Sequence, residues 1–184
     1  MLAWIWVIIV LVVLLIAIAI YYYNRFVVLE NRINNSSAQI DVQLKKRADL
    51  VPSLVKVVKS YAKFEKDVLT EVTKARTAMM GGKTLQDRAK AGNQLQDALK
   101  SIFAVAENYP QLKANENFLH LQTELSAIED KVAYARQFYN DSILGLENAS
   151  QRFPGVLFFK LYGRQKKDYL KIPESAKEMP KIDL

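Results

Sequence analysis

The chain of 184 residues contains no cysteine, 6 glycines and 5 prolines, and its formal net charge is +7. Without cysteine the protein has no disulfide, no thiol nucleophile and no cysteine-ligated metal centre. The small number of glycines and prolines favours long helices over a many-stranded sheet, and the roughly 160 residues after the first apolar stretch suffice for one domain with its own core.

The first stretch, from Leu2 to Tyr23, has no charged residue, no glycine and no proline, and it is almost wholly aliphatic between Ile5 and Ile20. A helix rises about 1.5 Å per residue, so about 20 apolar residues cross the ~30 Å hydrocarbon core of a bilayer. Residues 1–23 are therefore predicted to form a transmembrane anchor. The residues predicted to lie at its two membrane interfaces are Trp4, Trp6, Tyr21, Tyr22, Tyr23 and Arg25.

A cleaved signal peptide is the alternative for this stretch, because Ala17-Ile18-Ala19 matches a small-x-small cleavage site. A signal peptide needs a positively charged start and a short apolar core, whereas the first charged side chain here is Arg25 and the apolar run is long enough to span a bilayer. A buried core helix fits less well, since helices of water-soluble domains rarely contain so long an aliphatic run.

Basic residues follow the apolar stretch and favour a cytoplasmic domain with the N-terminus outside the cell membrane, which the protein crosses once. Arg25 and Arg32 follow the span closely, and Lys45, Lys46 and Arg47 come next. Further along, basic residues alternate with acidic ones and no nucleic-acid recognition motif accompanies them, so nucleic acid is not expected as a partner.

The next two predicted helices lie between Asn24 and Gly82. The first runs from Asn24 to about Ala48 and continues the anchor, since no proline or glycine occurs between Leu2 and Val51. Pro52 is predicted to break it, because the residue before a proline disfavours helix. The second covers Leu54 to about Met79 and ends at Gly81-Gly82.

Two more helices follow, at Leu85 to Glu107 and at Phe118 to Ala149, with Asn115 as the N-cap of the latter and Phe153-Pro154-Gly155 as its stop. The last helix has the most regular apolar spacing in the chain, typical of a bundle seam. The predicted fold is all-α: a single N-terminal transmembrane helix that continues into an antiparallel four-helix bundle, residues 24–155.

Residues 156–184 are predicted to form a basic, aromatic C-terminal segment whose end, from Ile172 to Leu184, is a flexible tail. The apolar run from Val156 to Tyr162 either packs on the side of the bundle or makes a second contact with the membrane or a partner. The residues of that candidate contact are Phe158, Phe159, Lys160, Tyr162, Arg164, Lys166 and Lys167.

The sequence offers no constellation for chemistry. His120 is the sole histidine, and a metal-binding bundle would repeat Glu-x-x-His on two helices, so we expect a surface histidine. Gly82-Lys83-Thr84 resembles the end of a phosphate-binding loop but lacks the earlier glycine and the preceding strand. We therefore predict no catalytic, metal-binding or cofactor-binding residue, and no small-molecule substrate.

Four segments resemble the LemA family, namely Ile40–Arg47, Asp49–Val55, Ala104–Phe118 and Ala135–Asn140. The resemblance covers nearly the whole chain. It implies a bacterial membrane protein with one N-terminal span and a helical-bundle domain, and it brings no catalytic residue. It also implies links to membrane remodelling, to magnetosome formation through related proteins, and to membrane metalloproteases encoded nearby. Lipoprotein members need a cysteine after the apolar run, which this chain lacks.

These observations favour a non-enzymatic, membrane-anchored scaffold or adaptor that contacts membrane lipid and self-associates as a homo-oligomer. The alternative is a regulatory subunit or substrate adaptor of a membrane metalloprotease.

Overall fold

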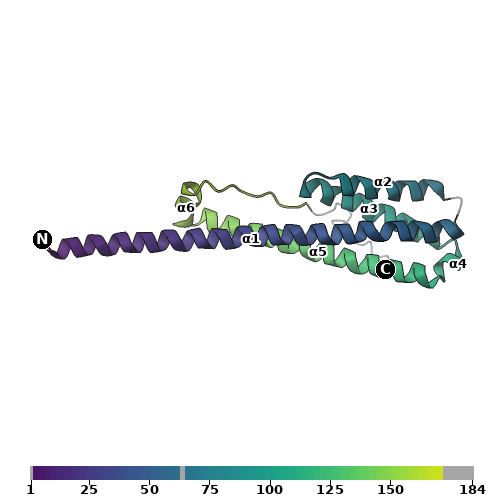
Figure 1. Ribbon diagram of the computed structural model, residues 1–184, viewed down its shortest axis with the longest axis horizontal. Helices are drawn as coiled ribbons and strands as arrows, with labels where there is room; N and C mark the ends of the chain where they lie inside the picture. Colours follow the sequence, from purple (N-terminus) through teal and green to yellow (C-terminus); the bar gives the residue numbers. More distant parts are fainter. Residues whose placement is uncertain (1, 63–64, 172–184) are drawn as a thin grey trace, which may run out of the picture. The chain divides into compact units, whose positions relative to one another are not determined.

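A computed structural model describes residues 2–62 and 65–171, and all regular secondary structure in these ranges is helical (Figure 1). The predicted all-α class is confirmed. The predicted tail, 172–184, lies outside the described residues, and so does Phe64, an apolar position of the helix predicted from Leu54 to about Met79. The helices are α1 (Leu2–Tyr61), α2 (Lys66–Gly81), α3 (Leu85–Ala106), α4 (Pro110–Lys113), α5 (Glu116–Gln151) and α6 (Gly155–Leu161).

Helix α1 is one continuous helix of 60 residues. The predicted continuation of the apolar stretch into the following helix is confirmed, but the predicted break at Pro52 is wrong, since Pro52 lies inside α1. A proline has no N–H to donate to the carbonyl four residues earlier, here that of Ala48. That carbonyl instead accepts a hydrogen bond from Arg76 Nε at 2.7 Å. Helix α2 thus supplies the donor that Pro52 lacks.

The helix predicted from Leu54 to Met79 is consequently divided between the end of α1 and the whole of α2. The predicted stop at Gly81-Gly82 is confirmed. Helix α3 begins with a capping box that we did not predict: Thr84 Oγ1 accepts from Asp87 N at 3.0 Å, and Asp87 Oδ2 accepts from Thr84 N at 3.2 Å. These two bonds satisfy donors that a helix start otherwise leaves unpaired.

Helix α5 begins where predicted, because Asn115 Oδ1 accepts a hydrogen bond from Phe118 N at 3.0 Å. It ends at Gln151, just before the predicted Phe153-Pro154-Gly155 stop. The regular spacing that predicts a bundle seam, alternately three and four residues, selects ten positions of this helix. All ten are buried: Phe118, Leu121, Leu125, Ile128, Val132, Ala135, Tyr139, Ser142, Leu146 and Ala149. The regular spacing of three and four residues therefore identified the buried face of α5.

The chain forms two compact units, each of which contains a part of α1 and a part of α5. One unit comprises the part of α1 up to Ser36 together with Gln137–Tyr169, and thus includes α6. The other extends from Ser37 to Arg136 and also includes Leu170. We call them the α6 unit and the α2–α3 unit.

The α2–α3 unit has an apolar core to which α1, α2, α3, α4 and α5 all contribute. Leu54, Val72, Leu95, Ile102 and Leu112 are among its fully buried side chains, each with an exposure of 0%. The core of the α6 unit contains residues of α1, α5 and α6, among them Phe26, Ile143, Leu146 and Phe159. Both cores are thus formed by apolar residues that recur every three or four positions along each helix.

Candidate functional site

His120 lies on the surface, as expected: its side chain is 72% exposed, and its Nε2 is 3.9 Å from Glu124 Oε1. Among the described residues no group of three or more histidine, aspartate, glutamate or cysteine side chains comes close enough together to hold a metal ion. His120 and Glu124 therefore form at most a surface pair one helical turn apart.

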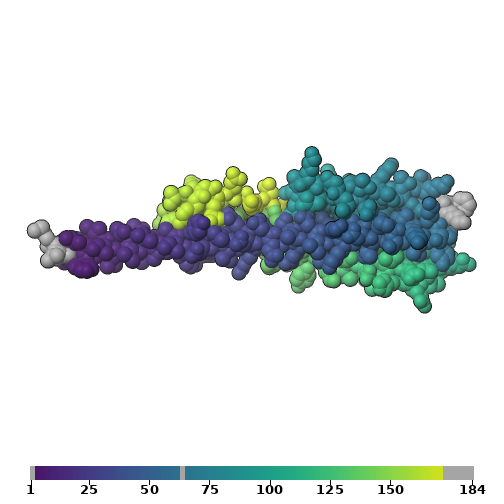
Figure 2. Space-filling view, viewed as in Figure 1, coloured from purple at the N-terminus to yellow at the C-terminus, as the bar shows by residue number. Residues whose placement is uncertain are grey.

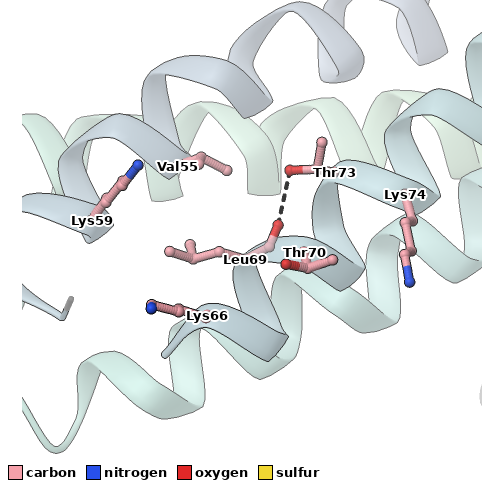
Figure 3. Close-up of a pocket in the computed structure, with 7 residues that line it drawn as sticks. All are labelled: Val55, Lys59, Lys66, Leu69, Thr70, Thr73 and Lys74. Atoms are coloured by element: carbon pink, nitrogen blue, oxygen red, sulfur yellow. Dashed lines mark hydrogen bonds between the residues drawn. The ribbon is translucent and has the colours of Figure 1, made fainter. Parts of the chain in front are cut away.

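A groove of about 420 Å³ opens between α1 and α2 (Figure 3). Its lining combines apolar side chains with three lysines and two threonines: Val55, Lys59, Lys66, Leu69, Thr70, Thr73 and Lys74. Thr73 Oγ1 donates to the Leu69 carbonyl at 2.8 Å, a bond within the helix itself. The lysines give the groove a positive potential that would attract anions, and the lining contains no histidine, cysteine, aspartate or glutamate.

Two arginines, Arg47 in the core and the half-buried Arg136, form a cluster in the α2–α3 unit. Arg47 is 1% exposed, forms an ion pair with Glu129, and donates through Nη1 to the Gly92 carbonyl at 3.3 Å. Burial, and secondly the charge of Arg136, lower the pKa of Arg47 to about 10. Burial removes water from the guanidinium, and the ion pair with Glu129 opposes that cost.

Arg136 joins the same cluster from α5. Its Nη1 donates to Asn93 Oδ1 at 2.7 Å and its Nη2 to the Ala89 carbonyl at 3.2 Å, and burial lowers its pKa. Gly92 of α3 lies close to both α1 and Arg136, because an added Cβ would come within 2.9 Å of Leu44 Cδ2 and 3.7 Å of Arg136 Nη2. The glycine allows the close approach that brings its carbonyl to Arg47.

In the α6 unit, aromatic side chains of α6 pack on the part of α1 that follows the apolar run. Phe158 stacks on Tyr22 with ring centroids 5.5 Å apart. Phe159 meets Phe26 edge to face at 5.4 Å. Aromatic pairs in these geometries contribute about 0.5–1.5 kcal/mol beyond the area they bury. Helix α6 is therefore held on α1 by ring packing.

Two polar groups that follow α6 reinforce this packing. The hydroxyl of Tyr162 donates to the Ala19 carbonyl at 2.8 Å. Arg164 forms an ion pair with Glu30, and its guanidinium lies 5.3 Å from the centroid of the Tyr23 ring. Since Arg164 is only 12% exposed, its charge is satisfied mainly by these neighbours on α1.

The side chains predicted at the membrane interfaces differ in their surroundings. Trp4, Trp6, Tyr21 and Tyr23 are between 49% and 74% exposed. Arg25 is exposed and its Nη1 donates to Tyr21 Oη at 3.4 Å, whereas Tyr22 is half-buried beneath α6. Their contact with a membrane remains a prediction.

The candidate second contact divides into two sets. Phe158, Phe159, Tyr162 and Arg164 face α1, whereas Lys160, Lys166 and Lys167 are exposed. Leu157 and Leu161, which we did not single out from the sequence, are 59% and 74% exposed. They are four residues apart and so share one face of α6. This spacing could have indicated from the sequence that the two leucines belong together.

Apolar exposure is most extensive at the start of α1. Every side chain from Ala3 to Ala17 is exposed, and this is where the described residues contain one helix long and apolar enough to cross a membrane. Figure 2 shows this stretch in purple, with no other described part of the chain against it. The first half-buried side chains are those of Ile18 and Ala19.

Comparison with known families identifies the chain. The model of the LemA family matches residues 36–184. The chain belongs to the LemA family. The match begins at Ser36, so it contains all of the α2–α3 unit but not the apolar part of α1. The family resemblance recognised in the sequence is confirmed.

Three relatives show how similar this LemA-family chain is to known proteins. It is 28% identical over 144 aligned residues to Magnetosome protein MamQ 2 of Paramagnetospirillum magneticum, covering 64% of this chain and 53% of the relative. It is 22% identical over 173 residues to Magnetosome protein MamQ of Magnetospirillum gryphiswaldense, covering 80% and 64%. It is 29% identical over 115 residues to Protein LemA of Metamycoplasma hominis, covering 60% and 51%. The chain thus spans about half to two thirds of the length of these relatives.

Proposed function

We propose that this LemA-family protein is a membrane-anchored, non-enzymatic helical scaffold that self-associates at the bacterial membrane. One observation carries the proposal: α1 is a single helix that is apolar and exposed from Ala3 to Ala17 and that supplies buried core residues from Phe26 onward. Apolar surface in water costs roughly 25 cal/mol per Å². A bilayer is the environment in which the exposed aliphatic part of α1 is stable.

The proposed body of the scaffold is an antiparallel four-helix bundle formed by α1, α2, α3 and α5. Its support is the order of the contacts along α1. Asn115 at the start of α5 bonds to Tyr61, and Glu129 further along α5 pairs with Arg47, so α5 runs opposite to α1. By the same comparison, the Arg88–Asp41 ion pair and the bond from Arg47 to Gly92 indicate that α3 runs parallel to α1. In this proposal the N-terminus is outside the cell and the bundle is cytoplasmic.

The relatives are consistent with a structural role. The MamQ proteins are named for a cellular structure, the magnetosome, and their names state no reaction. Exposed apolar side chains on α5 offer surfaces for a second copy: Tyr134 is 78% exposed and Leu119 is 46% exposed.

Site-directed cross-linking tests self-association. Because the chain has no cysteine, Tyr134→Cys introduces a unique thiol. Glu124→Cys is the control, at an exposed position of α5 that lies on a different face from Leu119. We expect oxidation in native membranes to give a covalent dimer for Tyr134→Cys and far less for Glu124→Cys. If the full-length protein is strictly monomeric and copurifies with nothing, the scaffold proposal is wrong. Stoichiometric copurification of a membrane metalloprotease with a monomeric chain would instead support the regulatory-subunit alternative.

A further inference from the structure

We propose that α6 is a second membrane contact, which inserts Leu157 and Leu161 into the interfacial layer of the same bilayer that α1 crosses. The inference rests on the proposed membrane anchoring and adds a lipid-binding element to it. It starts from the place on α1 where α6 packs.

The position of α6 follows from the length of α1 that remains uncovered. From the predicted interface residue Trp4 to Ala17, both included, there are fourteen residues, about 21 Å of helix at 1.5 Å per residue. A hydrocarbon core of ~30 Å needs about 20 residues. The span must therefore include the next turns of α1, up to about Tyr23.

Those turns are the ones that α6 covers. Tyr162 Oη reaches the carbonyl of Ala19, and the Phe158 ring lies on Tyr22. A helix packed at this level of the span is at the boundary between the acyl chains and the headgroups. Figure 1 shows α6 beside the corresponding part of α1.

The outer side of α6 has the chemistry of an interfacial helix. Leu157 and Leu161 project away from α1, with exposures of 59% and 74%, while Phe159 on the inner side is 9% exposed. Lys160, on the same short helix, is exposed, and so are Lys166 and Lys167 in the segment that follows. Apolar side chains that enter the bilayer beside lysines that reach anionic headgroups are typical of helices lying in the membrane interface.

A bilayer explains this surface better than a protein partner does. Helix α6 lies beside the turns of α1 that border its uncovered apolar stretch, since Phe158 stacks on Tyr22 and Tyr162, the residue directly after α6, bonds to the Ala19 carbonyl. A partner that covered Leu157 and Leu161 would have to occupy the level at which lipid already surrounds α1. The structure thus assigns the face to lipid.

Depth-dependent quenching tests the inference in the full-length protein. Three single-cysteine variants are labelled with a small environment-sensitive fluorophore: Leu157→Cys and Leu161→Cys on α6, and Leu11→Cys in the predicted span. Gln94→Cys, at an exposed position of α3, is the soluble-side control. Each is reconstituted into phosphatidylcholine/phosphatidylglycerol vesicles that contain lipids with a quencher at a shallow or a deep position of the acyl chain.

We expect labels at positions 157 and 161 to be quenched several-fold more by the shallow quencher than the label at position 94. The label at position 11 should respond most to the deep quencher. If the label at position 11 is quenched while those at 157 and 161 behave like the one at 94, the anchor stands and the α6 inference is wrong. If the label at position 11 is not quenched, the membrane anchoring itself is wrong. Because both leucines are exposed, their replacement should leave the fold intact.

Discussion

A double-mutant cycle can measure how far Arg76 compensates for the hydrogen bond that Pro52 cannot donate. Pro52 is exposed and has no N–H to donate to the carbonyl of Ala48, which is fully buried. That carbonyl accepts its hydrogen bond from Arg76 instead. In the Arg76→Met variant this carbonyl loses its donor, and an unpaired buried acceptor costs about 1–3 kcal/mol. In the Pro52→Ala background the new N–H at position 52 can bond to Ala48, so the same Arg76→Met change should cost less than about 1 kcal/mol.

Pro52→Ala alone should stabilise the protein. Proline costs about 3 kcal/mol relative to alanine inside a helix. Part of that penalty is the hydrogen bond that proline cannot donate, and Arg76 already supplies a donor to the Ala48 carbonyl. We therefore expect Pro52→Ala to stabilise the protein by about 1–2 kcal/mol, and the interaction energy between the two substitutions to be about 1–2 kcal/mol.

The assay is denaturant unfolding of the full-length protein in detergent micelles, followed by circular dichroism. Pro110→Ala is the matched control, since Pro110 occupies the first turn of α4, where proline is tolerated, and it should change stability little. If Arg76→Met costs the same with proline and with alanine at position 52, Arg76 does not compensate for the proline and our explanation of the unbroken α1 is refuted.

Two further substitutions, at residues that contact Arg47, test its surroundings by the same assay. Glu129→Gln should destabilise the protein by about 3–5 kcal/mol, because it leaves the charge of Arg47 buried and uncompensated. Burial lowers the pKa of Arg47 to about 10 in the folded state, so its charge is fully present below that pH and its burial is unfavourable there. The loss of stability in Glu129→Gln should therefore be constant from about pH 6 to 9. Glu124→Gln, at an exposed position of the same helix, should change the stability little. Gly92→Ala should cost about 1–3 kcal/mol despite the better helix propensity of alanine, whereas Gly81→Ala, where an added Cβ meets nothing within 4 Å, should be neutral or stabilising. An equal effect of the two glycine substitutions would contradict the tight packing at Gly92.

Patterns within one helix were read correctly from the sequence. The buried stripe of α5, its Asn115 cap and its stop all depend on residues close together in the chain, as does the long apolar run of α1. Such local signals are sufficient because helix periodicity and capping are set within a few residues.

Features that depend on distant residues were missed. The consequence of Pro52 depends on Arg76 in another helix, and nothing around the proline reveals that donor. The burial of Arg47 was likewise hidden, because its Lys45-Lys46-Arg47 run looks like a solvated basic face, and only Glu129 and the Gly92 carbonyl make its burial possible. The orientation of α6 required knowledge of which aromatic rings it meets on α1.

The packing of α6 also decides at which residue a soluble fragment of the protein should begin. The family match begins at Ser36, and a fragment that started there would lack Tyr22 and Phe26, on which Phe158 and Phe159 pack. Their rings would then be uncovered in water, a state that favours aggregation. A fragment that retains α1 from Ile18 onward would keep this aromatic contact while omitting the uncovered aliphatic turns.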